Sequence, residues 1–164
     1  MNTPHKIEKK IVLKASRDRV WDAVSNSKNF GVWFGVWFDG PFVGGQWLAG
    51  RIVPTQVDPE VAKHQEPHRG TPFHILVETI APKERFAFRW HPYAIDKGKD
   101  YSKEPTTLVT FQLTDATDGV LLTITESGFE NIPAERRADA FTANEGGWAH
   151  QCKLIEKYLA LGRP

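Results

Sequence analysis

Hydrophobic and polar residues alternate along much of the chain up to about residue 127, and two-residue alternation predicts β-strands. The predicted strands cover residues 7–14, 36–38, 46–53, 73–81, 85–91, 107–113 and 120–127. In the strand over 85–91, Phe86, Phe88 and Trp90 fall on one face, because successive side chains point to opposite sides. The strands therefore have an apolar face that another element must cover.

A three- to four-residue spacing of apolar positions predicts helices in the remaining segments. Ser16 is a suitable N-cap for a helix over residues 17–25, and a second short helix is expected over residues 27–33. Pro133 suits the first turn of a helix that continues to about Leu161. Only this last helix is long enough to cover the strands, so the predicted fold class is α+β.

Two polar segments, residues 54–72 and 92–105, interrupt the strands. The first contains four prolines, and the second is rich in charged residues. Each is longer than an ordinary hairpin loop, so we expect two insertions that can act as lids. The length of 164 residues fits a single domain over residues 1–164, with a core over residues 6–161.

Composition narrows the classes of function. The chain has 21 basic and 20 acidic residues, mixed along its length, for a net charge of +1. No basic block follows the pattern of a phosphate-binding surface, so no nucleic-acid partner is expected. No apolar run approaches the roughly 20 residues that span a bilayer, and no signal peptide is recognisable. We therefore expect a cytoplasmic protein without a membrane span, as a monomer or a weak homodimer.

The sequence offers no convincing metal or cofactor site. His64 and His68 are four residues apart, but Pro67 argues against a helix that presents them together. A zinc site needs three or four converging ligands, and no supporting acidic cluster is visible. Neither a glycine-rich phosphate loop nor a nucleophile-elbow serine occurs. We expect no metal and no cofactor.

Strand alternation singles out one carboxylate, that of Glu126. Leu122, Ile124 and Glu126 share one face of the strand over 120–127, and the two apolar members are expected to point inward. Glu126 would then stand at the wall of the interior, where it could orient a polar group of a ligand or act as a general base. The alternative is a place at the strand end, near water or paired with an arginine.

The terminal helix presents a matching stripe. Asn144, Trp148 and Cys152 are spaced by four residues, and Phe141 can join the same line. If the stripe faces the sheet, Asn144 is a buried polar group that needs a partner, which a ligand or Glu126 could provide. The alternative is an ordinary core stripe in which backbone or water satisfies Asn144. Cys152 is expected to be a buried thiol without a catalytic role.

Several short motifs, taken in order along the chain, carry a family resemblance. They are Ala15-Ser16 with Val20-Trp21, Trp33-Phe34-Gly35, Gly44-Gly45-Gln46-Trp47, Pro82-Lys83-Glu84-Arg85-Phe86, Thr123-Ile124-Thr125-Glu126-Ser127-Gly128-Phe129 and Gly147-Trp148. Together they resemble the START-like (SRPBCC, Bet v 1-like) superfamily, in the branch named for the activator of the heat-shock protein 90 ATPase. The resemblance implies a helix-grip fold, in which a curved antiparallel sheet of about six or seven strands wraps around a long C-terminal helix. It also implies two short helices after the first strand and a deep cavity between sheet and helix.

Aromatic residues are the expected lining of that cavity. Alternation places Trp47, Phe88, Trp90 and Phe111 on inward faces, whereas Trp33 and Phe129 are assigned through the resemblance. A flat or aromatic ligand would stack on such rings. The alternative for each ring is ordinary core packing. The full expected ligand-binding set is Trp33, Trp47, Phe88, Trp90, Phe111, Glu126, Phe129, Phe141, Asn144, Trp148 and Cys152.

These residues favour a protein that binds a small hydrophobic or aromatic molecule, lipid- or polyketide-like, over an enzyme. An alternative is an aromatase-, cyclase- or hydrolase-like enzyme that uses Glu126 as acid or base. A second alternative is a protein-interaction module with a chaperone partner, as in the co-chaperone that gives the family its name. That co-chaperone stimulates its partner through an asparagine-rich segment with Trp-His-Trp, which this sequence does not match.

Overall fold

The structure is a computed structural model that describes residues 5–96 and 98–161. The predicted domain limits within residues 1–4 and 162–164, and Lys97 in the second insertion, lie outside the described residues. The elements in chain order are β1 (Lys6–Leu13), α1 (Arg17–Ser25), α2 (Ser27–Phe34), β2 (Val36–Phe38), β3 (Trp47–Leu48), β4 (Gly50–Ile52), α3 (Pro59–Gln65), the 3-10 turn η1 (Glu66–His68), β5 (Ile75–Ala81), β6 (Arg85–Trp90), β7 (Thr107–Ala116), β8 (Gly119–Ser127), the 3-10 turn η2 (Phe129–Asn131) and α4 (Ala134–Ala160).

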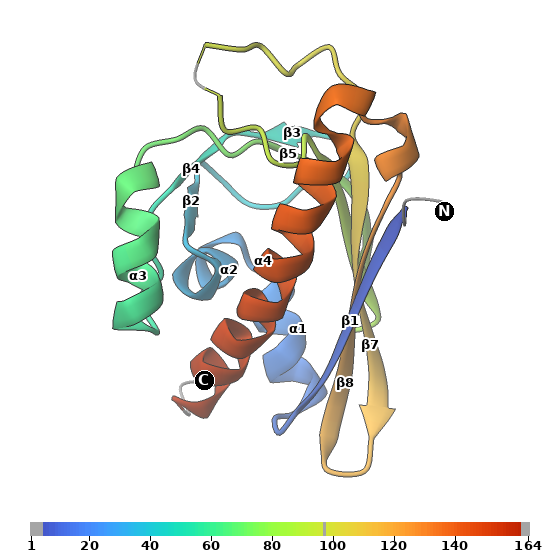
Figure 1. Ribbon diagram of the computed structural model, residues 1–164. Coiled ribbons are helices and arrows are strands. Elements are labelled where there is room, and N and C mark those ends of the chain that lie inside the picture. The colour runs from blue at the N-terminus through green and yellow to red at the C-terminus, as the bar shows by residue number, and fades with distance from the viewer. Residues whose placement is uncertain (1–4, 97, 162–164) are drawn as a thin grey trace.

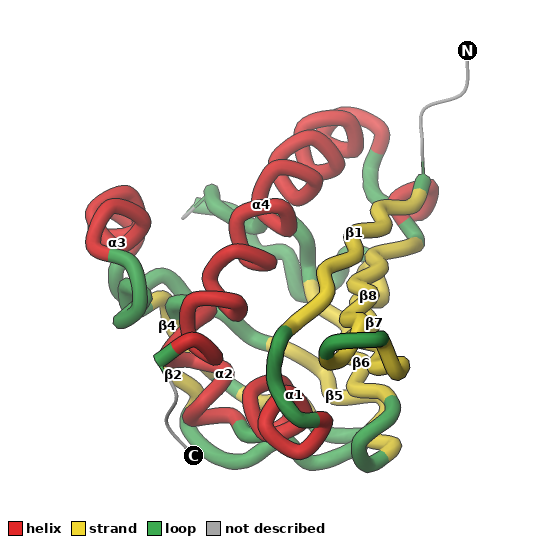
Figure 2. The backbone as a smooth tube through the Cα atoms, turned by 90° about the horizontal axis from the view of Figure 1, so that it is seen from below, coloured by secondary structure: helices red, strands yellow, loops and turns green. Residues whose placement is uncertain are grey.

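Six strands form one antiparallel sheet in the order β1-β8-β7-β6-β5-β3, and β2 pairs with β4 in a separate small sheet. The helix α4 runs diagonally across one face of the large sheet, and α1 and α2 lie beside it, α1 near the end of β1 and α2 next to β2 (Figure 1). Seen from below, α4 passes between α3 on one side and β1, β8 and β7 on the other (Figure 2). This is the α+β helix-grip fold, so the predicted fold class is confirmed.

Local sequence explains the two short helices after β1. The Ser16 side chain accepts a hydrogen bond from the backbone N–H of Arg19 and so caps α1. Asn26 caps α2 in the same way, through the N–H of Asn29. α2 ends at Gly35, whose φ of 100° lies in the left-handed region that favours glycine.

The predicted strand over residues 46–53 is divided in two. Its first part, β3, pairs with β5 at the edge of the large sheet, and its second part, β4, pairs with β2. The chain crosses between the sheets at Gly50, where an added Cβ would lie 2.7 Å from the carbonyl oxygen of Phe73. Only glycine fits such a close approach of two backbones, and alternation alone does not reveal where a strand changes partner.

The predicted insertion over residues 54–72 contains a helix. Asp58 caps α3 by accepting hydrogen bonds from the N–H groups of Glu60 and Val61, and Pro59 occupies the first turn. An ion pair between Asp58 and Lys157 ties α3 to α4. The sequence Asp-Pro-Glu is itself a helix-start signal, so this helix could have been predicted.

Candidate functional site

Glu126 is fully buried on the inner face of β8, as strand alternation predicted. Leu122, Ile124 and Glu126 each have 0% of their surface exposed. Ile7 of β1 and Val109 of β7 lie opposite Glu126 on the neighbouring strands, and both are buried. The carboxylate therefore lies in apolar surroundings, where an ionised group is stable only with hydrogen-bond partners.

Four neutral side chains donate hydrogen bonds to this carboxylate. At the end of β6, Trp90 Nε1 donates to Oε2 at 2.8 Å, and at the start of β7, Thr107 Oγ1 donates to the same oxygen at 2.6 Å. From α4, Trp148 Nε1 donates to Oε1 at 2.8 Å. Asn144 Nδ2, also on α4, lies 2.9 Å from Oε1 and 3.1 Å from Oε2. We call Glu126 and these four donors the Glu126 site.

The donors occupy both oxygens of the carboxylate. A carboxylate offers about four lone-pair positions, and the four donors make two contacts with Oε1 and three with Oε2. Within residues 5–96 and 98–161, no ion pair includes Glu126. Dipoles rather than a cation therefore stabilise the carboxylate. Glu126 does lie near the end of β8, but the alternative that it is close to water or paired with an arginine is wrong. Of the two partners expected for Asn144, a ligand or Glu126, the structure shows Glu126.

The four donors differ in their exposure to solvent. Thr107 and Trp148 are buried, with 0% and 2% of their surfaces exposed. Trp90 and Asn144 are only half-buried. A molecule that approached Glu126 from solvent would therefore meet Trp90 and Asn144 first.

Aromatic rings pack against one another beside the Glu126 site. The ring centroids of Phe111 and Trp148 are 5.8 Å apart, those of Phe88 and Trp90 are 5.5 Å apart, and those of Trp90 and Trp148 are 5.7 Å apart. Further rings joined to these by ring contacts are Phe30, Trp33, Phe34, Phe38, Phe42, Phe73 and Phe86. A cavity was expected at this position, but in this structure the rings fill it, and a cavity would have to form by their separation.

One predicted lining residue is misplaced. Trp47 has 52% of its surface exposed, and its ring stacks on that of His91 at 5.9 Å. The prediction that alternation turns Trp47 inward is wrong, because Trp47 pairs with Leu76, which lies between two inward-facing residues of β5 and therefore points to the outer face of the sheet. Its indole contacts His91, just before the 92–105 loop.

The other predicted residues are buried but do not contact Glu126. Trp33 is fully buried and donates its Nε1–H to the carbonyl oxygen of Ala23 at 2.9 Å. Phe129 and Phe141 form an edge-to-face pair at 5.1 Å. Cys152 has 7% of its surface exposed, and burial raises the pKa of its thiol. A raised pKa keeps the thiol protonated at neutral pH, which is typical of a structural cysteine.

Thr107 is the one member of the Glu126 site that was not predicted. A hydroxyl residue at the start of an alternating strand looks like an ordinary β-former. The signal was nevertheless present, because Thr107 shares its strand parity with Val109 and Phe111, which both face inward.

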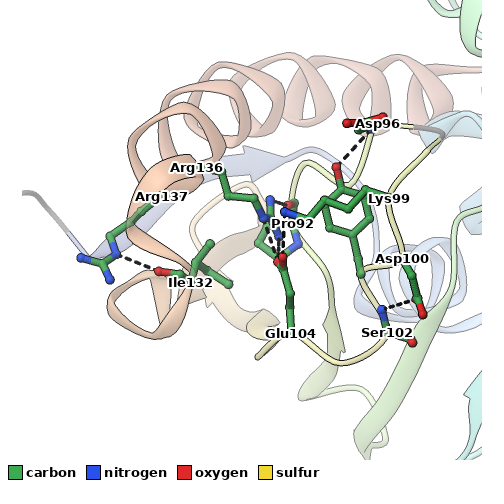
Figure 3. Close-up of polar contacts among 10 residues, drawn as sticks. Pro92, Asp96, Lys99, Asp100, Ser102, Glu104, Ile132, Arg136 and Arg137 are labelled. Carbon is green, nitrogen blue, oxygen red and sulfur yellow. Dashed lines mark hydrogen bonds and ion pairs between the residues drawn. The ribbon is translucent and has the colours of Figure 1, made fainter.

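The second insertion, the 92–105 loop, is anchored to the first turns of α4. Arg136 Nε donates to Glu104 Oε1 at 2.8 Å, and its Nη1 donates to the carbonyl oxygen of Pro92 at 2.7 Å. Lys99 Nζ lies 3.0 Å from the other oxygen of Glu104. These side chains converge between the loop and the helix (Figure 3). The segment is therefore held in place by charged contacts rather than freely solvated.

The Arg136–Glu104 contact is well shielded, since only 12% and 13% of the two side chains are exposed. Burial acts to raise the pKa of Glu104, but hydrogen bonds from Arg136 and Lys99 outweigh burial and hold this pKa below its ordinary value of 4.5. On the next position of the helix, Arg137 contacts only its own neighbourhood, through the carbonyl oxygens of Ile132 and Glu130. The two adjacent arginines thus differ in whether they hold the loop.

The surface has two depressions that are lined by other residues. Their volumes are about 290 and 320 Å³, and both border the exposed side chain of Trp37. Lys28 and Asp39 line the first, while Arg51 and Arg69 line the second. Neither depression is lined by a member of the Glu126 site.

Among residues 5–96 and 98–161, no group of three or more histidine, cysteine, aspartate or glutamate side chains is arranged to hold a metal ion. None of the helices formed by those residues has the length and apolar character needed to cross a membrane.

Several solved structures share this fold. The protein is similar to DynU16, a protein in the dynemicin biosynthetic locus, with a TM-score of 0.68 and 22% identity over 99% of this chain and 49% of that one. The chain thus spans about half the length of DynU16. It is also similar to protein MLL2253 from Mesorhizobium loti (TM-score 0.69, 19% identity, 97% and 99% of the two chains). Protein Ms6760 from Mycobacterium smegmatis is a third similar structure (TM-score 0.67, 12% identity, 99% of both chains). At these identities the similarity shows a shared fold.

The resemblance to the START-like superfamily is confirmed by a match to one of its families. The family model for activator of Hsp90 ATPase homolog 1-like proteins matches residues 14–160, and the chain belongs to that family. A search of curated proteins found no significant match.

Proposed function

We propose that the protein binds a small hydrophobic or aromatic molecule between α4 and the large sheet, with Glu126 orienting a polar group of that ligand. The observation that carries this proposal is a fully buried carboxylate, held only by neutral donors, among aromatic rings. Burial of a carboxylate has a desolvation cost that an apolar residue at the same position would avoid. A role in ligand binding would account for a carboxylate at this position. Polar groups that fix orientation within an apolar lining are typical of small-molecule sites.

Affinity would come from apolar burial, at about 25 cal/mol per Å² of surface removed from water. The rings of Trp90, Trp148 and Phe111 would have to separate to admit the ligand, and one donor would have to leave Glu126. Trp90 and Asn144 are the donors to be displaced, because they are half-buried while Thr107 is fully buried.

The two polar segments are proposed to control access. The 92–105 loop connects Trp90 to Thr107, so it joins two donors of the Glu126 site directly. The segment over residues 54–72 carries α3, which lies next to β4 in both views (Figures 1 and 2). Of the two, the 92–105 loop is the better candidate for a lid, since its displacement would move Trp90.

The family assignment supports a binding role without specifying the ligand. DynU16, one of the similar structures, belongs to a biosynthetic locus, which is consistent with a small organic molecule as ligand. The name of the family is not evidence of chaperone activation by this chain, and no contact in the structure favours that role.

The enzymatic alternative assigns Glu126 the role of acid or base. A general base needs a lone pair within hydrogen-bond reach of its substrate, and both oxygens of Glu126 are occupied by protein donors. None of those donors is a second carboxylate or a histidine. The observed contacts therefore favour a residue that orients a ligand over one that transfers its proton.

The proposal is tested by titrating the protein with 2-naphthylmethanol, a flat neutral compound, while following tryptophan fluorescence. Two matched variants locate the site: Trp148→Phe removes a donor from the Glu126 site, and Trp37→Phe changes an exposed tryptophan of β2. We expect saturable binding that Trp148→Phe weakens and Trp37→Phe preserves, with both variants folded by circular dichroism. Absence of saturation, or loss of binding in Trp37→Phe alone, would overturn the proposal.

A further inference from the structure

Every side chain that hydrogen-bonds to Glu126 is the donor, which is the arrangement that suits an ionised carboxylate, and none of these donors is a cation. The five hydrogen-bond contacts come from two indoles, a hydroxyl and an amide, none of which carries a charge. Two cations near the site are already paired, because Lys99 of the 92–105 loop and Arg136 of α4 both contact Glu104. A ligand that displaces donors from Glu126 can therefore also supply the missing cation.

We infer that the ligand is an aromatic compound that carries a protonated amine, and this inference rests on the proposed function. An ammonium group is a donor of up to three hydrogen bonds and accepts none. It could replace both the Trp90 and the Asn144 contacts with Glu126 and add an attraction between opposite charges. A hydrogen bond between two charged groups is about twice as strong as one between neutral groups.

The surrounding rings favour the same chemistry. The centroids of Trp90 and Trp148 are 5.7 Å apart, and Phe73 contacts Trp90 edge-on at 5.3 Å. At present both indoles point their N–H edges at the carboxylate. When the Trp90 indole is displaced, its face becomes available to the cation, and a cation over an indole face is a favourable contact. A protonated amine could thus form both an ionic hydrogen bond with the carboxylate and a cation–π contact with an indole face.

The same arrangement excludes acidic ligands. A ligand carboxylate would meet Glu126 in a region of low dielectric, where like charges repel strongly. A ligand alcohol can replace one N–H donor but brings no charge, so it should bind more weakly than the amine. The inference therefore predicts an order of affinity, in which the amine is followed by the alcohol and the acid binds worst.

A series on one ring system tests this order. The unmodified protein is titrated calorimetrically at neutral pH with 2-naphthylmethylamine, 2-naphthylmethanol, 2-methylnaphthalene and 2-naphthoic acid. We expect the amine to bind at least about tenfold more tightly than the alcohol, with no measurable binding of the acid. Glu126→Gln should remove the advantage of the amine. Glu78→Gln, which deletes an exposed carboxylate paired with Arg89 on the sheet, should leave the order unchanged.

The outcomes separate the two proposals. Any order in which the amine is not the tightest ligand overturns the inference, while binding of the alcohol or the hydrocarbon keeps the proposed function. Failure of all four compounds to bind overturns both. The order on the unmodified protein decides the question even if Glu126→Gln does not fold. An amine preference that persists in a folded Glu126→Gln protein would also overturn the inference, because the charge would then lie elsewhere.

Discussion

Trp90 and Thr107 stand at the two ends of the 92–105 loop, and both donate a hydrogen bond to the same oxygen of Glu126, at 2.8 and 2.6 Å. One carboxylate oxygen therefore fixes both ends of a long loop. On the opposite side the loop is held to α4 by Arg136, through Glu104 and Pro92. Displacement of the Trp90 indole by a ligand would free one end of the loop, which links occupancy of the site to loop mobility.

The contribution of Glu126 to folding stability can be measured by substitution. Glu126→Gln keeps the size of the side chain but places an NH₂ group against indole, hydroxyl and amide donors. We expect a loss of about 3 kcal/mol in the free energy of unfolding, because buried donors lose their acceptor. Urea unfolding measures the loss. Glu78→Gln, at an exposed ion pair, should change stability by less than about 1 kcal/mol. Equal effects in the two variants would contradict the account of the site.

Thr107 offers a cleaner deletion of one hydrogen bond. Thr107→Val preserves the shape of the side chain and removes only its donation to Glu126 Oε2. The expected loss is about 1–2 kcal/mol in the free energy of unfolding. Thr110→Val, on the opposite face of β7, is the matched control and should be nearly neutral. A neutral Thr107→Val would show that the contact contributes nothing to stability.

Substitutions of the adjacent Arg136 and Arg137 can test whether Arg136 anchors the 92–105 loop. Arg136→Gln removes the contacts with Glu104 and Pro92, whereas Arg137→Gln affects only local contacts with Ile132 and Glu130. Amide hydrogen exchange in residues 92–105 should become about tenfold faster in Arg136→Gln, which corresponds to about 1.4 kcal/mol of local opening. Arg137→Gln should leave this exchange unchanged. The account of the anchored loop fails if the two variants behave alike.

Alternation and helical spacing were sufficient to find most of the candidate site. They placed Glu126 inward on its strand, and they placed Asn144 and Trp148 on one stripe of the last helix. Both rules depend only on the geometry of a single element, so they hold without knowledge of the rest of the fold. The resemblance then gave the fold that brings the helix onto the sheet.

What the sequence did not reveal depends on contacts between distant segments. Trp47 is exposed because its strand pairs with β5 in a register that places it opposite Leu76 on the outer face, and this register is not visible in the sequence of the strand itself. The Arg136–Glu104 pair joins residues 32 positions apart, and charge composition alone does not indicate which charges meet. The close packing of the interior rings depends on their rotamers, which the pattern of hydrophobic residues does not specify.

His91 makes stability depend on pH. It follows Trp90, its Nδ1 has no hydrogen-bond partner among the described residues, and burial lowers its pKa below the ordinary 6.5. The charged groups around it oppose one another, since Glu104 and Asp100 favour its protonation and Arg136 disfavours it. Because the folded pKa is the lower one, the unfolded chain binds more protons below pH 6.5. Folding stability should therefore decrease as the pH falls below 6.5.

The contribution of His91 can be separated from that of Glu104. The pKa of Glu104 is also lowered, so its contribution to stability is lost only below its ordinary value of 4.5. His91→Gln should consequently flatten the stability profile between pH 4.5 and 6.5, measured by urea unfolding at each pH. His150→Gln, at an exposed position of α4, should leave the profile unchanged. A profile that keeps its slope in His91→Gln would assign the effect to another group.

The most direct test is a crystal structure of the protein with bound 2-naphthylmethylamine. We expect its nitrogen to lie about 3 Å from a Glu126 oxygen, with the Trp90 indole turned away and the interior rings moved apart. A compound found only in the depressions beside Trp37, with the rings and the five contacts of Glu126 unchanged, would contradict the assignment of a ligand site beneath α4.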